Sequence, residues 1–109
     1  MQTLVQVFCS RGPSLREAIA RDGRLEKFGL QVVKMHQPGR SPGWLKLSST
    51  RRGGRGVVNI EWDADTRLLT CRMVTRGVAL PATLLSDFLN YLLSRRGGRI
   101  RAVMVIPRT

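Results

Sequence analysis

Two arginine-rich segments with the same five letters are the part of the sequence best suited to chemistry. Arg51-Arg52-Gly53-Gly54-Arg55 recurs as Arg95-Arg96-Gly97-Gly98-Arg99, and each copy is followed by an apolar run typical of a β-strand. Arginine offers a planar cation with several N–H donors that fit phosphate or carboxylate oxygens. Paired glycines remove side-chain bulk, so the backbone can approach a ligand closely. The repeat therefore predicts anion contacts from Arg51, Arg52, Arg55, Arg95, Arg96 and Arg99.

The net charge of the chain points to a large anionic partner. Its 109 residues include 19 Lys and Arg but only 7 Asp and Glu, which gives a formal net charge of +12. A surplus of that size on a small domain favours a polyanion, and nucleic acid is the first candidate. We therefore expect a non-enzymatic domain that binds single-stranded DNA or RNA.

Polar side chains on the predicted strands extend this candidate surface. In the run from Trp44 to Ser48, Leu45 and Leu47 alternate with Trp44 and Lys46, which places the tryptophan and the lysine on the polar side. Arg72 takes the polar side of a later strand, and Arg40 lies in the turn that precedes Trp44. The predicted site thus also contains Arg40, Trp44, Lys46 and Arg72.

Trp44 has two interpretations of equal weight. On an exposed basic face its indole would stack on an unpaired base. Alternatively, the ring packs beneath the proline-rich turn from Pro38 to Pro42 and has a structural role. Trp62 shares the register of Val58 and Ile60, so we expect it in the core.

Three acids close together support a different function. Glu61, Asp63 and Asp65 could hold Mg²⁺ for phosphodiester cleavage, which would make the protein a metal-dependent nuclease. The favoured interpretation is a tight turn in which Asp63 and Asp65 bond the local backbone and Glu61 pairs with an arginine. Another alternative is a protein-interaction subunit whose basic surface docks an acidic partner or an anionic membrane. The glycine spacing matches no nucleotide-binding fingerprint, so no cofactor is expected.

Hydrophobic periodicity predicts one α+β domain over residues 1–109, with the order β-α-β-β-β-β-α-β. We expect a mainly antiparallel sheet of five to six strands, with two helices on one face and the other face open. The expected strands are Leu4–Phe8, Leu30–His36, Trp44–Ser48, Val57–Trp62, Leu68–Val74 and Ile100–Ile106, and the last of them is expected inside the sheet. The helices are expected to begin at the Ser14 cap and at Pro81, and to end at Gly23 and Gly97.

This arrangement predicts where the two arginine-rich segments lie. Tracing the strand directions places them at opposite ends of the sheet. The second segment also follows the end of a helix, where cations favour the negative end of the helix dipole, so part of its role is structural. In the hairpin between the segments, Ile60 is expected opposite Leu69 and Val58 opposite Cys71.

The remaining signals concern the cysteines and the cellular compartment. Cys9 and Cys71 lie in apolar runs without another ligand at metal-binding spacing, which predicts buried free thiols. The first residues lack the pattern of a secretory leader, and no apolar run approaches the length needed to span a membrane. We therefore expect a cytoplasmic protein without integral membrane association.

Overall fold

The computed structural model describes residues 2–53, 55–76 and 81–108, and it has the predicted order of strands and helices. Its strands are β1 (Gln2–Cys9), β2 (Leu30–Lys34), β3 (Trp44–Ser49), β4 (Val57–Asp63), β5 (Leu68–Val74) and β6 (Ile100–Ile106). Its helices are α1 (Leu15–Ala20) and α2 (Ala82–Arg96), with two short 3₁₀ turns, η1 (Leu25–Phe28) and η2 (Gly97–Arg99). The α+β prediction is confirmed.

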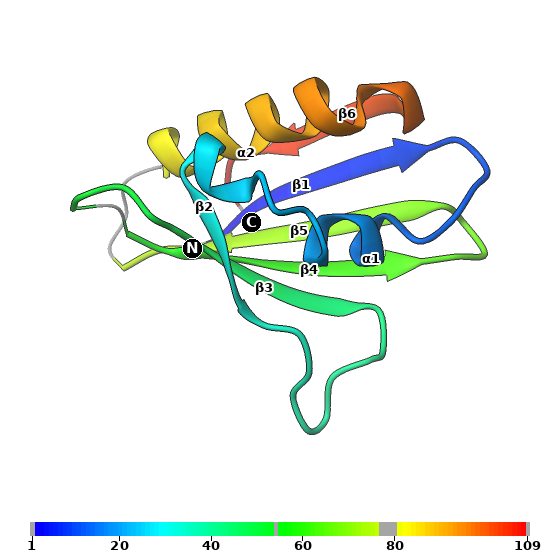
Figure 1. Cartoon of the computed structure of the whole chain (residues 1–109), viewed down its shortest axis with the longest axis horizontal. Helices are drawn as coiled ribbons and strands as arrows, with labels where there is room; N and C mark the ends of the chain where they lie inside the picture. The colour runs from blue at the N-terminus through cyan, green and yellow to red at the C-terminus, as the bar shows by residue number, and fades with distance from the viewer. Residues whose placement is uncertain (1, 54, 77–80, 109) are drawn as a thin grey trace.

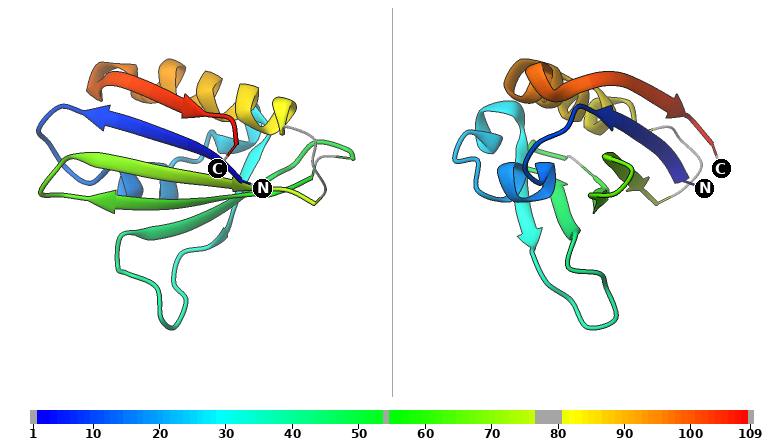
Figure 2. Two further views of the ribbon diagram at one scale, coloured as in Figure 1. Left: turned by 180° about the vertical axis from the view of Figure 1, so that it is seen from behind. Right: turned by 90° about the vertical axis from the view of Figure 1, so that its right-hand side faces the viewer.

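All six strands form one antiparallel sheet in the order β2-β3-β4-β5-β1-β6. Figures 1 and 2 show both helices on the same side of this sheet. The core lies between the two layers, because alternate strand residues such as Val7, Ile60 and Cys71 are fully buried against Ile19 and Phe88 of the helices. We call the other side of the sheet the open face.

The predicted position of β6 is wrong, because this strand is an edge of the sheet. Among the described residues, it pairs only with β1. Its apolar run resembles that of an interior strand, yet Ala102 and Met104 are exposed on the open face while Val103 and Val105 pack against the core. β6 is rich in apolar residues because its side chains are apolar on both the core-facing side and the open face.

The β4–β5 hairpin has a different register from the one predicted. Ile60 pairs with Cys71 instead of Leu69, so β5 is shifted by two residues and each side chain stays on its predicted face. The turn itself explains the shift. The Asp63 Oδ1 atom accepts hydrogen bonds from the N–H groups of Asp65 and Thr66, at 3.0 and 3.4 Å, while Arg67 adopts a left-handed φ of 57°.

The N-terminal boundary of α1 is confirmed, but its end is not. The Ser14 Oγ atom caps the helix by accepting the Glu17 N–H at 3.3 Å. The helix ends at Ala20, before the predicted Gly23, and the left-handed glycine of this region is Gly29, which terminates η1 with φ 79°. β2 ends at Lys34 after a register irregularity, which fits the change of phase in its apolar residues.

Arg16 of α1 is 3% exposed and connects the helix to the edge of the sheet. Its Nε atom donates to the Trp44 carbonyl at 2.9 Å, and its Nη2 atom donates to the Met35 carbonyl. Both carbonyls lie where β2 and β3 separate and no longer form hydrogen bonds with each other. The Arg16 guanidinium supplies the missing donors.

We expect Arg16→Leu to destabilise the fold by about 2–3 kcal/mol, because two carbonyl groups lose their donor. Chemical denaturation measures this loss. Arg21→Leu is the matched control, since that side chain is 82% exposed, and it should change stability by about 0.5 kcal/mol or less. Equal losses in the two variants would contradict the role assigned to Arg16.

Candidate nucleic-acid interface

The two arginine-rich segments lie at opposite ends of α2 and of the sheet, as predicted (Figure 1). The first forms the β3–β4 connection, beside the start of α2. The second comprises the last residues of α2 and η2. Their identical sequences have different surroundings, and the contacts of each arginine show what the two segments do.

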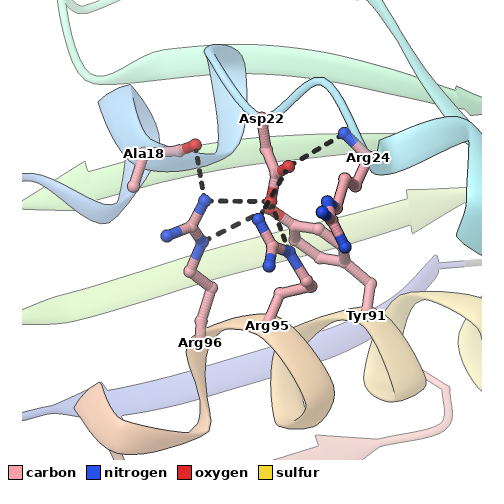
Figure 3. A network of polar contacts seen from close by, with 6 residues as sticks. All are labelled: Ala18, Asp22, Arg24, Tyr91, Arg95 and Arg96. Atoms are coloured by element: carbon pink, nitrogen blue, oxygen red, sulfur yellow. Dashed lines mark hydrogen bonds and ion pairs between the residues drawn. The ribbon is translucent and has the colours of Figure 1, made fainter.

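In the second segment, Arg95 and Arg96 bind the carboxylate of Asp22, which follows α1 (Figure 3). The Arg96 Nη2 atom lies 2.9 Å from Asp22 Oδ2, and the Arg95 Nε atom lies 3.2 Å from the same oxygen. The Tyr91 hydroxyl donates to this oxygen at 2.9 Å, and the Arg24 N–H donates to the Asp22 Oδ1 atom at 2.9 Å. The carboxylate therefore joins the segment after α1 to the last turns of α2.

The ionisation of Asp22 reflects these contacts. Burial alone would raise its pKa, but hydrogen bonds from Arg95, the Arg24 N–H and Tyr91 outweigh burial and lower the pKa to about 2. Burial raises the pKa of Tyr91 to about 12. Asp22 is therefore ionised at neutral pH, and its charge is stabilised by donor groups of the protein itself.

Arg99 is also engaged by the fold. Its Nη1 atom donates to the Pro13 carbonyl at 2.8 Å and its Nη2 atom to the Ser10 carbonyl at 3.1 Å. Gly12 makes room for this guanidinium, because a Cβ there would lie 2.7 Å from the Arg99 guanidinium carbon. The second segment therefore has a structural role beyond the predicted dipole effect.

In the first segment, Arg51 contacts the fold, whereas Arg52 and Arg55 differ from it. Arg51 forms a two-pronged ion pair with Asp87 of α2, with Nε–Oδ2 at 2.6 Å and Nη2–Oδ1 at 2.9 Å. Hydrogen bonding to Asp87 raises the pKa of Arg51. Within the described residues, the exposed side chains of Arg52 and Arg55 have no hydrogen-bond or ion-pair partner.

A groove lies beside these two arginines. One hollow of about 350 Å³ is lined by the first arginine-rich segment, the end of β5 and the start of α2, including Ser49, Arg52, Arg55, Thr75, Arg76 and Thr83. A second hollow of about 570 Å³ shares Arg55, Thr75 and Arg76 and reaches Val57 and Val74 on the open face. We call this continuous feature the basic groove. The first turn of α2 contains no acidic residue to offset its positive charge.

The open face carries a row of polar and basic side chains next to the groove. Strand pairing aligns Lys34 with Lys46, Lys46 with Asn59, and Asn59 with Arg72. Lys46 and Arg72 therefore lie on the open face, as predicted. We call these four residues the basic row.

Trp44 does not offer its ring to solvent. The side chain is 1% exposed, and the Arg40 guanidinium carbon lies 5.4 Å from the centre of the ring. The prediction of a stacking platform is wrong, and the alternative in which the ring packs beneath the preceding turn describes the structure. Trp62 is half-buried against the core, as expected.

The acidic hairpin lacks the features of a metal site. Asp63 bonds the turn backbone, whereas Glu61 and Asp65 are exposed. Among residues 2–53, 55–76 and 81–108, no group of three or more His, Cys, Asp or Glu side chains could hold a metal ion.

The two cysteines are buried free thiols, as predicted, and burial raises the pKa of both. No helix among the described residues is long and apolar enough to cross a membrane.

Sequence reasoning missed several residues of this surface. Arg76 follows β5, and antiparallel pairing of β4 with β5 brings it beside Arg55, so a correct register would have identified it. Lys34 required the pairing of β2 with β3. The acidic partners Asp22 and Asp87 are far from the arginines in sequence, and no local pattern indicates those ion pairs.

We expect Asp22→Asn to lower stability by about 2 kcal/mol at neutral pH, since each unit of pKa shift corresponds to about 1.4 kcal/mol. The pKa in the folded state lies below the ordinary value of 3.8, so the contribution is complete above that value and declines as the pH falls towards 2. Denaturation of parent and variant between pH 7 and pH 2 should show a difference that closes in acid. The exposed Asp65→Asn is the control, and a difference that does not vary with pH would contradict the assignment.

Comparisons with known proteins do not identify the chain. Searches against family models, curated proteins and solved structures gave no significant match. The function is therefore inferred from the charges and shape of the surface itself.

Proposed function

We propose that this domain binds single-stranded nucleic acid without catalysing a reaction, and that the basic groove holds its phosphates. One observation carries the proposal: Arg52, Arg55 and Arg76 line an open groove and have no ion-pair partner among the described residues. Arg51, Arg95 and Arg96, in contrast, are bound to Asp87 or Asp22. The cations of the groove thus remain available to an external anion.

The groove has the chemistry that phosphate recognition requires. Guanidinium groups bind phosphate oxygens through paired N–H donors. Hydroxyl groups of Ser49, Thr75 and Thr83 line the same hollow and supply neutral donors. The positive end of the α2 dipole adds a smaller favourable contribution.

The basic row continues the groove across the open face. From the pair Val57–Val74, which borders the groove, to the pair Asn59–Arg72 is two residues along each strand, or about 7 Å. From Arg72 to Lys34 is three strand spacings, or about 14 Å. This length suits several consecutive phosphates better than one small anion.

A single strand is favoured because the open face also presents apolar side chains to unpaired bases. Phe8 of β1 is 39% exposed on this face, between Leu68 and Ala102. Leu4 of the same strand pairs with Arg72, the last residue of the basic row. Bases inside a duplex could not reach these side chains, whereas unpaired bases could stack on Phe8.

We expect the triple change Arg52→Ala, Arg55→Ala and Arg76→Ala to weaken binding of a single-stranded oligonucleotide by roughly 10- to 100-fold. The slope of log affinity against log salt should become less steep by about 2, because each phosphate contributes about 0.7. Fluorescence anisotropy across a salt series measures both quantities, on single-stranded DNA, RNA and duplex DNA.

A control variant distinguishes the loss of groove contacts from the loss of net positive charge. Arg11→Ala, Arg24→Ala and Arg101→Ala remove the same charge from exposed positions outside the groove. This control should retain most of the affinity. Equal weakening by the two triple variants, or binding that does not respond to salt, would overturn the proposal.

Phe8→Ala tests the contact with bases. We expect the affinity for a single strand to fall by about 1–3 kcal/mol while the salt slope stays unchanged, because stacking releases no counterions. Met35→Ala is a suitable control and should leave the affinity unchanged, since it removes an exposed apolar side chain beyond the end of β2. Unchanged affinity in Phe8→Ala would exclude this residue as a base contact.

A further inference from the structure

The two edges of the sheet differ in how well they are protected against pairing. β2 is a short edge of 5 residues with a register irregularity and a terminal lysine. β6 has a register irregularity of its own at Arg101, but from Ala102 to Ile106 it carries only apolar side chains. Charged residues and bulges protect edges from pairing, so this apolar part of β6 is the less protected of the two edges.

A second apolar feature lies along the same edge. α2 runs beside β6 in both Figures 1 and 2. Leu85, Leu89 and Leu93 follow one another at four-residue spacing and therefore share one side of this helix. Leu85 and Leu89 are half-buried, whereas Leu93 is 58% exposed. Tyr91 and Arg95 point to the opposite side, towards Asp22, so the leucine stripe faces away from α1.

We propose that β6 pairs with β6 of a second copy of this chain, which makes the sheet continuous across a two-fold axis. The unpaired backbone of an edge strand specifies another β-strand as its partner. A second copy is favoured over a different chain because one symmetric contact protects both unprotected edges at once. The same contact also covers both β6 and the leucine stripe of α2 beside it.

The residues of β6 suit such a symmetric contact. An antiparallel pair centred on Val103 places Ala102 opposite Met104 of the other copy. Arg101 lies at the register irregularity, outside this regular part of the strand, so no like charges face each other in the pair. The same two-fold axis, perpendicular to the sheet, brings the leucine stripe of α2 towards the stripe of the second copy.

This arrangement has a consequence for the open face. A two-fold axis perpendicular to the sheet keeps both helix layers on one side and both open faces on the other. The dimer therefore presents one continuous open surface with a basic groove from each copy. Dimerisation needs no nucleic acid, so its test is independent of the proposed function.

Sedimentation in the absence of nucleic acid tests the dimer. In about 0.15 M salt, where charge repulsion is screened beyond roughly 8 Å, we expect the parent protein to have twice the mass of one chain at micromolar concentration. Leu93→Lys combined with Ala102→Lys alters exposed positions on both layers of this edge and should give a monomer with unchanged circular dichroism.

The matched control introduces the same charges at the other edge. Val33→Lys combined with Met35→Lys changes residues that are 45% and 46% exposed in or next to β2, and this variant should remain a dimer. A monomeric parent protein, a dimer that survives the β6 changes, or a dimer lost only in the β2 variant would each overturn the proposal.

Cysteine pairing tests the register. Ala102→Cys and Met104→Cys variants, mixed in equal amounts and treated with oxidised glutathione, should form a mixed disulfide dimer in higher yield than either variant alone. The reason is that opposite residues lie about 5 Å apart, whereas residues of the same number would be diagonal neighbours at about 7–8 Å. The native cysteines are buried and do not compete. Equal yields in all three samples would exclude this register.

Discussion

The ion pair that fixes the helix layer is the one between the buried carboxylate of Asp22 and the two arginines at the end of α2. The helices lie on one face of the sheet, and packing together with polar contacts holds them in position on it. Asp22 makes such a contact at one end of α2, and Asp87 makes another by binding Arg51 of the β3–β4 connection. Each contact joins segments that are distant in sequence, and together they hold the second turn and the last turn of the long helix.

These contacts also divide the positive charge of the molecule. Acidic residues are scarce, with 7 against 19 lysines and arginines. Of the two that bind arginine-rich segments, Asp87 belongs to α2 and Asp22 contacts its last turns. Arg51 pairs with Asp87, and Arg95 and Arg96 share the charge of Asp22, whereas Arg52, Arg55 and Arg76 have no ion-pair partner among the described residues. The identical five-letter segments thus have different roles because their acidic neighbours differ. Local sequence could not reveal this difference, since Asp22 and Asp87 are 73 and 36 positions away from Arg95 and Arg51.

Much of the fold could be predicted because it depends on short-range patterns. Alternation in Trp44–Ser48 predicts that Leu45 and Leu47 face the core, and the four-residue spacing in α2 predicts its buried side. The errors occurred where contacts outside the periodic pattern decide the outcome. β6 has the composition of an interior strand, but its place at the edge depends on the order of all six strands. Trp44 alternates with buried leucines, yet the Arg40 turn covers its ring, and no periodicity records that cover.

The same physical constraint connects the basic groove with the unprotected edge. Like charges that remain unpaired repel one another and lower the stability of a compact chain, so a groove of unpaired arginines has a cost that a bound polyanion relieves. An apolar edge strand exposed beside an apolar helix stripe also has a cost, which pairing with a second copy relieves. The two features lie on different strands, with the groove beside the central strands β4 and β5 and the apolar edge at β6, separated from β5 by β1. In the proposed dimer, a second copy at β6 would therefore leave each groove accessible, and its own positive charge would strengthen the attraction of the shared open surface for a nucleic acid, the proposed partner.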